Sequence, residues 1–168
     1  NAAKAHQTGI RWSITKPVFS ADGSTWVHTK EISYLNTFGL GSKLGLPSQF
    51  HFKSPIAAET LWVAYSYPYM SSDLAAFLKT IKNVNSVAIS VLGKSEEGRD
   101  IVKIHITEPS PIDKKKQSIW VIGREHPGET PQSYLCEGMI KALLESAAGR
   151  KLRDAFDFTF VPMLNVDG

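Results

Sequence analysis

The 168-residue sequence contains a single cysteine, Cys136. One thiol cannot form an internal disulfide, and it cannot supply the paired cysteines of a zinc ribbon or of a Cys-x-x-Cys redox site. The sequence also lacks an apolar run of the roughly 20 residues that a transmembrane helix needs, and its first residues lack the apolar centre of a signal peptide. We therefore expect a globular protein of the cytoplasm with no membrane segment.

An excess of one charge is missing as well, because 19 Lys and Arg oppose 16 Asp and Glu and leave a net charge of only +3. This excess is too small to predict a nucleic-acid partner. The motifs GxSxG, GxxxxGK[ST] and GxGxxG are absent, so a serine hydrolase, an NTPase and a dinucleotide-binding enzyme have no support. The hydrophobic content of 42% is that of a globular domain with an ordinary core.

The first 69 residues alternate apolar and polar side chains in short runs, which is the pattern of half-buried strands. Residues 21–24 and 39–42 are rich in turn-forming Gly, Asp and Ser. The sequence therefore predicts an antiparallel β domain over residues 1–69. We expect its strands at residues 10–14, 26–28, 32–35, 50–52 and 61–65.

From residue 70 on, helical and strand patterns alternate. Apolar residues at helical spacing, Leu74, Phe77, Leu78 and Ile81, predict one amphipathic helix of about three turns, with its N-cap within Ser71-Ser72-Asp73. Strands are predicted at residues 86–92, 101–107, 119–122 and 156–164, and the all-apolar third run indicates burial on both faces. This order predicts the beginning of an α/β domain with a mixed sheet over residues 70–168.

A second helix is predicted over residues 131–147. Thr130 is its expected cap, Pro131 stands at its first position, and Gly149 marks its end. Four apolar residues at helical spacing form its expected inward stripe: Leu135, Met139, Ala142 and Leu143.

Residues 123–130, GREHPGET, lie between the predicted strand 119–122 and this helix. Ligands of α/β sheets bind where the carboxyl end of a strand meets a helix N-terminus. His126 and Glu129 are three positions apart, and an imidazole and a carboxylate at this spacing can face one zinc ion. Pro127 and Gly128 make the residues between them a turn, in which Gly128 is free to adopt a positive φ.

The spacing alone leaves two interpretations open. In the first, His126 and Glu129 are two of the three protein ligands of a catalytic zinc site. In the second, His126 faces solvent and Glu129 interacts with the positive N-terminus of the helix. These residues by themselves do not decide between the two.

The wider sequence resembles the zinc metallocarboxypeptidase family, and HPGET at residues 126–130 resembles its cytosolic carboxypeptidase branch, including bacterial-type members. The sequence differs from the family pattern at two positions: Val166 stands where the family usually has Pro, and Gly128 stands where the digestive branch has Arg. The other matching segments follow the family's order and are SADGSTW (20–26), VAYSYPY (63–69) with SDL (72–74), LGKSEEGR (92–99) and VPMLNVDG (161–168).

The resemblance implies that His126 and Glu129 are the first two zinc ligands, and that Zn²⁺ activates a water for attack on the C-terminal peptide bond of a peptide or protein. A preference for acidic residues is one option. In the family the third ligand, the general base and a carboxylate-binding Asn-Arg pair follow the segment matched by residues 161–168. We therefore expect an N-terminal fragment of a carboxypeptidase that is inactive alone and binds zinc weakly or not at all.

Two alternatives share the His-x-x-Glu turn: a zinc amidohydrolase that deacylates N-acyl amino acids, and a non-catalytic binding module without a metal. The resemblance of the β domain argues against the amidohydrolase. Among single residues, we expect Arg99 to stabilise a hairpin, Arg124 to lie at the surface in solvent or near an acidic substrate, and Cys136 to pack inside the fold. The oligomeric state is left open.

Overall fold

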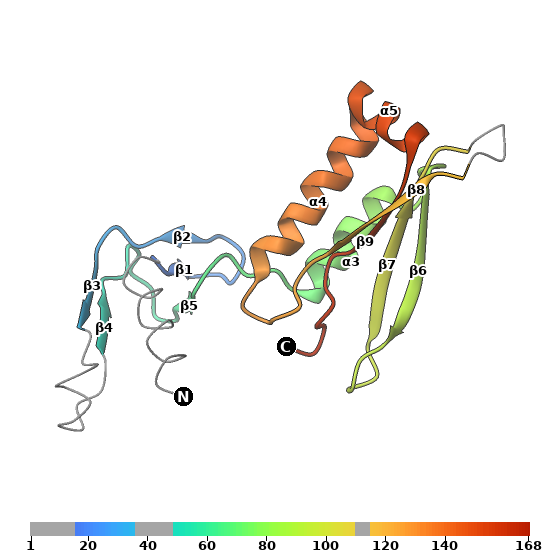
Figure 1. Cartoon of the computed structure of the whole chain (residues 1–168). Helices are drawn as coiled ribbons and strands as arrows, with labels where there is room; N and C mark the ends of the chain where they lie inside the picture. Colours follow the sequence, from blue (N-terminus) through green and yellow to red (C-terminus); the bar gives the residue numbers. More distant parts are fainter. Residues whose placement is uncertain (1–15, 36–48, 110–114) are drawn as a thin grey trace. The chain divides into compact units, whose positions relative to one another are not determined.

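The computed structural model describes residues 16–35, 49–109 and 115–168 of the chain (Figure 1). The chain divides into two compact units, Asn1–Tyr67 and Pro68–Gly168. The expected strand at residues 10–14 and the expected turn at residues 39–42 lie outside the described residues.

The first unit consists of short antiparallel strands. Strand β1 (Val18–Ser20) pairs with β2 (Val27–His28) on one side and with β5 (Trp62–Ala64) on the other, while β3 (Ile32–Leu35) pairs with β4 (Gln49–Phe52). The core includes Phe19, which is fully buried. Its ring packs edge-on against the ring of Phe52, with the ring centroids 5.2 Å apart. The sequence pattern missed β1, because Pro17 precedes it and only three residues pair.

The turn between β1 and β2 is held by Asp22. Its carboxylate accepts hydrogen bonds from the backbone N–H groups of Ser24 and Thr25, at 2.8 and 2.7 Å, and from the Ser20 hydroxyl. These bonds stabilise the ionised carboxylate and lower its pKa. Gly23 follows with a φ of +74°, which glycine adopts without the strain that a Cβ would cause.

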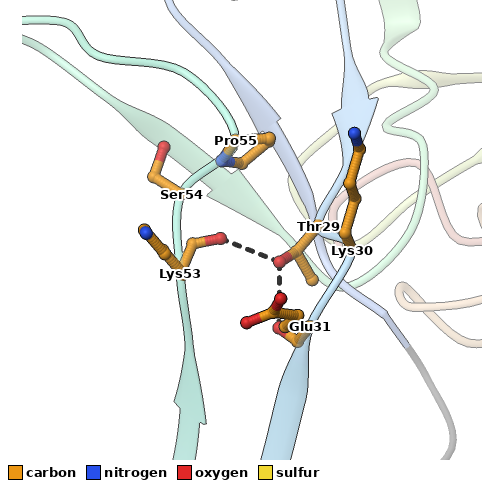
Figure 2. Close-up of a pocket in the computed structure, with 6 residues that line it drawn as sticks. All are labelled: Thr29, Lys30, Glu31, Lys53, Ser54 and Pro55. Atoms are coloured by element: carbon orange, nitrogen blue, oxygen red, sulfur yellow. Dashed lines mark hydrogen bonds between the residues drawn. The ribbon is translucent and has the colours of Figure 1, made fainter.

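A pocket of about 280 Å³ opens in this unit beside Thr29, whose hydroxyl lies 2.8 Å from the Lys53 carbonyl and 3.0 Å from the Glu31 carbonyl. Figure 2 shows that the ammonium groups of Lys30 and Lys53 point in different directions. The two cations therefore do not converge on one point as a pair that binds an anion would.

The second unit contains a four-stranded mixed sheet with the order β6-β7-β9-β8. Strand β7 is antiparallel to both β6 and β9, whereas β8 runs parallel to β9. The elements are β6 (Val87–Lys94), β7 (Asp100–Ile106), β8 (Gln117–Ile122), β9 (Phe156–Val161) and the helices α3 (Ser71–Ile81), α4 (Thr130–Glu145) and α5 (Ala147–Ala155). This confirms the predicted antiparallel β part followed by a mixed α/β sheet.

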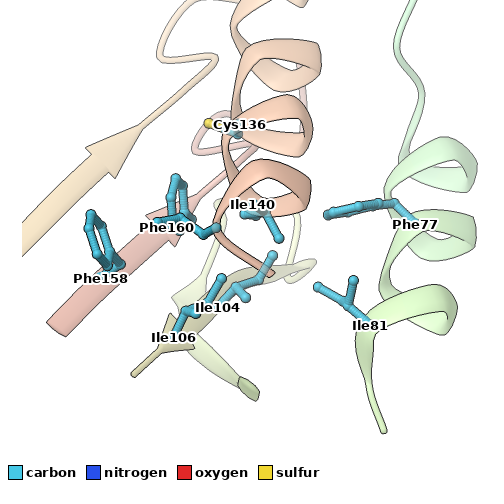
Figure 3. Close-up of a cluster of buried hydrophobic side chains, with 9 residues drawn as sticks. Phe77, Ile81, Ile104, Ile106, Cys136, Ile140, Phe158 and Phe160 are labelled. Atoms are coloured by element: carbon cyan, nitrogen blue, oxygen red, sulfur yellow. The ribbon is translucent and has the colours of Figure 1, made fainter. Parts of the chain in front are cut away.

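Helices α3 and α4 pack on one face of this sheet (Figure 3). Each fully buried Ile or Phe side chain in such a core contributes about 1.5–3 kcal/mol to folding. The core residues come from both helices and from the two central strands: Phe77, Ile81, Ile104, Ile106, Cys136, Ile140, Leu143, Phe158 and Phe160.

The inward stripe expected for α4 is wrong at two of its four positions. Leu135 is 61% exposed and Ala142 is also exposed, whereas Cys136 and Ile140 are buried. Two neighbouring rows of this helix are apolar, so helical spacing fits both of them. Packing against β7 and β9 selects the row that contains Ile140.

The expected end of this helix at Gly149 is also wrong. Helix α4 ends at Glu145, and Ser146 caps a second helix, α5, by accepting a hydrogen bond from the Gly149 N–H at 2.9 Å. A Cβ at Gly149 would lie 2.3 Å from the Leu143 carbonyl oxygen. Glycine is therefore needed here for the close approach of two helices rather than for a helix end.

Two further expectations are corrected. Strand β8 is not buried on both faces, because its Trp120 and Ile122 are 52% and 54% exposed. The N-cap of helix α3 is Met70, one residue before the segment in which the cap was expected. The backbone N–H of Met70 donates to the Asp73 carboxylate at 2.6 Å, so Asp73 stabilises this N-terminus from the third helical position.

Candidate metal site

The turn over residues 123–129 connects the carboxyl end of β8 to the N-terminus of α4. Its first residue, Gly123, extends the pairing of the strands by donating its N–H to the Val161 carbonyl at 2.8 Å. A Cβ at Gly123 would lie 3.2 Å from the Cys136 sulfur and 3.2 Å from the Pro162 carbonyl oxygen. Any residue larger than glycine at this position would therefore have to displace its neighbours.

Arg124 makes the sharp change of direction in this turn. Its φ is +53°, a left-handed conformation that non-glycine residues rarely adopt. Its backbone N–H donates to the Gln132 side chain at 2.7 Å, and its carbonyl accepts from the Asn165 N–H at 2.9 Å. The positive φ expected at Gly128 is thus found at Arg124 instead.

The side chain of Arg124 turns inward. The residue is only 7% exposed, and its guanidinium donates to the carbonyl of Tyr69 and, at 3.4 Å, to that of Gly168. The expected position at the surface is therefore wrong. A long side chain with five donors suits this place because it reaches two separate backbone segments from one residue.

His126 and Glu129 are brought together at the end of the turn. The imidazole Nδ1 lies 3.2 Å from the carboxylate Oε1, and the side chains are 73% and 40% exposed. The backbone supports this approach, because the Glu129 N–H donates to the His126 carbonyl at 3.1 Å. Glu129 is also the residue that precedes α4 as its N-cap, so its position follows from where the helix begins.

The carboxyl group of Glu129 is kept ionised by this arrangement. Desolvation by itself would raise its pKa, but hydrogen bonds from the side chain and backbone of His126 outweigh it, and the pKa lies below its ordinary value. An ionised carboxylate beside a solvent-accessible imidazole is a donor pair that zinc accepts. The two residues therefore fit two positions of a tetrahedral zinc site.

In the described part of the chain, no group of three or more His, Cys, Asp or Glu side chains is close enough to hold a metal ion. His126 and Glu129 thus form a pair without a third such ligand among residues 16–35, 49–109 and 115–168. The hydrogen bond of Ser133, whose hydroxyl donates to the Pro162 carbonyl at 2.8 Å, fixes the first turn of α4 against the segment that follows β9.

The other singled-out residues have structural positions. Arg99 bonds Glu97 at 2.6 Å and Asp167 at 2.5 Å in and beside the β6–β7 hairpin, which agrees with its expected hairpin role. Cys136 is 1% exposed, and burial raises the pKa of its thiol to about 11. The sequence pattern missed Asp167 and Gln132, since neither stands at a recognisable spacing from the residues they bond.

Comparison with known proteins decides the family. The zinc carboxypeptidase family model matches residues 74–168 of the chain. The chain belongs to the zinc carboxypeptidase family. This confirms the resemblance found in the sequence, and it places the His126–Glu129 turn inside the matched region.

The curated relatives of this zinc carboxypeptidase chain are cytosolic carboxypeptidases. Cytosolic carboxypeptidase 6 of Mus musculus is 36% identical over 110 residues, which are 62% of the chain and 20% of that protein. Cytosolic carboxypeptidase 2 of Xenopus tropicalis is 35% identical over 150 residues, 83% of the chain and 15% of that protein. The chain thus spans about a fifth or less of the length of these relatives.

Solved structures of bacterial metallocarboxypeptidases share the fold. The Burkholderia cenocepacia enzyme has a TM-score of 0.81 and 27% identity, with 100% of the chain and 42% of that structure covered. The Pseudomonas aeruginosa enzyme, in complex with (2-guanidinoethylmercapto)succinic acid, has a TM-score of 0.73 and 25% identity, with coverages of 100% and 41%. Of the helices that the structure describes, none has the length and apolar character to cross a membrane.

Proposed function

We propose that this chain is part of a zinc-dependent metallocarboxypeptidase that removes C-terminal amino acids from peptides or proteins, with His126 and Glu129 as two of the zinc ligands. The single observation that supports this most is the 3.2 Å approach of the His126 Nδ1 to the Glu129 Oε1 within the family-matched region. In this proposal residues 1–69 form the β domain and residues 70–168 the first part of the peptidase domain.

The chain's own residues prepare this site in three ways. Gly123 and Arg124 set the direction of the turn, the Glu129 N–H ties the two ligand residues together, and the exposure of both side chains leaves room for a substrate. Bound zinc would supply a Lewis acid and an activated water. The carboxyl group of Glu129, whose pKa is lowered by its hydrogen bonds from His126, binds a metal as the ionised carboxylate.

The substrate class follows from the relatives. Their name as cytosolic carboxypeptidases favours a peptide or protein C-terminus over an N-acyl amino acid, and it supports a place in the cytoplasm. A preference for acidic C-terminal residues rests only on the branch resemblance and on the net charge of +3. If the turn binds no metal in the whole protein, the alternative is a non-catalytic binding module.

A zinc titration of the 168-residue chain, followed by NMR, tests the ligand assignment. We expect Zn²⁺ to shift the resonances of residues 126–129 with weak affinity, because two ligands hold the ion poorly. His126→Ala should abolish these shifts. Glu125→Gln is the matched control, since Glu125 lies in the same turn, is exposed, and is not a proposed ligand.

Two results would contradict the assignment: zinc shifts that are the same in His126→Ala as in the parent chain, or tight stoichiometric zinc in a chain whose described residues supply only two of the proposed ligands. The activity is tested in the whole protein by release of C-terminal amino acids from peptides. His126→Ala should abolish this release and Glu125→Gln should retain it.

A further inference from the structure

The loop of the β6–β7 hairpin, residues 95–99, binds the carboxylate of Asp167. The Ser95 hydroxyl donates to Oδ1 at 2.8 Å, the Glu97 N–H donates to Oδ2 at 3.1 Å, and the Arg99 Nη1 donates to Oδ1 at 2.5 Å. The Asp167 side chain is 19% exposed although it lies between polar groups. Three donors on one carboxylate, one of them cationic, form a specific receptor rather than a chance surface contact.

The loop holds this arrangement through its own bonds. The Ser95 N–H donates to the Arg99 carbonyl at 2.9 Å, and the Arg99 N–H donates to the Ser95 hydroxyl at 3.0 Å. Gly98 has a φ of +79°, a conformation that suits glycine, and its N–H donates to the Ser95 carbonyl at 3.0 Å. The donors are therefore oriented by the hairpin itself and not only by the presence of Asp167.

The carboxyl group of Asp167 responds to these donors. Desolvation acts to raise its pKa, but the hydrogen bonds from Glu97, Ser95 and Arg99 outweigh it, so the pKa is lower than usual. The loop therefore binds Asp167 as an anion and favours its ionised form.

Asp167 belongs to a short turn, residues 164–168. This turn lies directly against residues 123–129, which we call the metal turn because they contain His126 and Glu129. The Leu164 N–H donates to the Gly123 carbonyl at 3.0 Å, and the Asn165 N–H donates to the Arg124 carbonyl at 2.9 Å. The Asn165 side chain in turn accepts from the Gly168 N–H at 3.0 Å. Both ends of the 164–168 turn are thus fixed, one by the metal turn and the other by the hairpin loop.

Gly168 makes the contact with the ligand-bearing part of the metal turn. A Cβ at Gly168 would lie 2.2 Å from the Cγ of Pro127, so the backbone of Gly168 is pressed against the ring of that proline. Pro127 is the neighbour of His126. A continuous path of contacts therefore runs from Arg99 through Asp167 and Gly168 to Pro127.

We propose that Ser95 and Arg99 are positioning residues for the His126–Glu129 pair, and that they act through Asp167. The hairpin loop then supports the metal turn from outside, as outer-shell partners orient the ligands of metal sites. The metal identity rests on the proposed function, but the positioning itself concerns only contacts within this chain. Nothing in the sequence spacing indicates this role, because Arg99 and Asp167 are 68 positions apart.

Amide hydrogen exchange of the metal-free 168-residue chain tests this proposal. The reporters are the amides of Glu129 and Asn165, which are bonded within and onto the metal turn, and the reference is the ladder between β7 and β9. Arg99→Gln is expected to speed exchange of both reporters about tenfold relative to that ladder. Arg99→Lys, which keeps the charge, should restore part of the protection, and Asp167→Asn should reproduce the Arg99→Gln result.

Lys94→Gln is the matched control, because Lys94 forms an exposed ion pair with Asp100 at 2.6 Å in the same hairpin without contacting Asp167. It should leave both reporters unchanged. Acceleration confined to residues 95–99 in Arg99→Gln, or an equal effect of Lys94→Gln, would overturn the proposal. If Arg99→Gln also speeds exchange in the reference ladder, Ser95→Ala is used in its place, because it removes a single donor from Asp167. Exchange of the Glu129 and Asn165 amides is then compared with exchange of the ladder in that variant.

This experiment contains no metal, so its result is independent of zinc binding. Faster exchange of the reporters together with zinc shifts that His126→Ala leaves unchanged would retain the positioning role and refute the ligand assignment of the proposed function. Zinc shifts abolished by His126→Ala together with unchanged reporters would retain the proposed function and refute the positioning role.

Discussion

The guanidinium of Arg153 donates to a single carboxylate oxygen of Glu108 through both Nε, at 2.9 Å, and Nη2, at 2.6 Å. The side chains are only 8% and 21% exposed, and the third nitrogen, Nη1, donates to the Leu143 carbonyl. This pair therefore joins three parts of the second unit, Pro68–Gly168: the segment after β7, the end of α4, and helix α5.

Removing one partner of this pair leaves the other buried without compensation. We expect Glu108→Ala to lower the free energy of unfolding by about 3 kcal/mol, the range known for broken buried ion pairs. Urea denaturation measures the effect. Lys94→Ala breaks an exposed ion pair and should cost less than about 1 kcal/mol. Equal losses for the two variants would show that the burial of the Arg153–Glu108 pair has no energetic consequence.

Two glycines of the metal turn should respond differently to the same substitution. A Cβ at Gly123 would meet the Cys136 sulfur and two carbonyl oxygens within 3.3 Å, whereas a Cβ at Gly128 would meet nothing within 4 Å. We expect Gly123→Ala to destabilise the chain by about 1–3 kcal/mol through overpacking. Gly128→Ala should change stability by less than about 1 kcal/mol. Thermal unfolding of both variants compares them directly, and a larger loss for Gly128→Ala would contradict the geometry.

Many elements of the second unit are predicted by local sequence patterns. Helix α3 contains the stripe predicted for it, with Leu74, Phe77 and Ile81 buried, because one apolar stripe faces the sheet and no second apolar row competes with it. In α4 two adjacent rows are apolar, so the choice of Ile140 over Leu135 depends on contacts with β7 and β9, which are distant in sequence. The exposed side of β8 likewise depends on which elements pack against each face of the sheet, not on the composition of the strand.

Part of the candidate site was likewise predictable from the sequence, and part was not. The closeness of His126 and Glu129 was predictable from the sequence, because their spacing is short and they stand between a strand and a helix. The residues that hold their turn were not, since the bonds of Arg124 to Tyr69 and of Arg99 to Asp167 join positions 55 and 68 residues apart. Bonds of this kind leave no periodic pattern in one sequence.

Arg124 offers a way to separate backbone strain from side-chain bonding. Its φ of +53° costs a residue with a Cβ about 1 kcal/mol, and glycine avoids this cost. Arg124→Gly and Arg124→Ala both lose the bonds to Tyr69 and Gly168 and should both be less stable than the parent chain. We expect the Ala variant to be the less stable of the two by about 1 kcal/mol in urea denaturation. An Ala variant as stable as the Gly variant would mean that the turn does not require this φ.

The buried thiol of Cys136 predicts a pH dependence at the alkaline end. Burial raises the pKa of this group from 9.0 to about 11, so between these values the unfolded chain loses the thiol proton while the folded chain keeps it. The stability linked to this group is therefore complete below pH 9 and is lost as the pH rises toward 11. Cys136→Ala removes the titrating group, although it also leaves a small cavity that lowers stability at every pH.

The measurement is the slope of unfolding free energy against pH, not its absolute value. Between pH 9 and 11 the parent chain should lose stability more steeply than Cys136→Ala, whereas below pH 8 the two curves should run parallel. Tyr69, whose phenol pKa is also raised by burial and by its bond to Glu137, adds the same slope to both chains and cancels in the comparison. Parallel curves across the whole range would show that the Cys136 thiol is accessible to solvent in the folded chain, contrary to its 1% exposure.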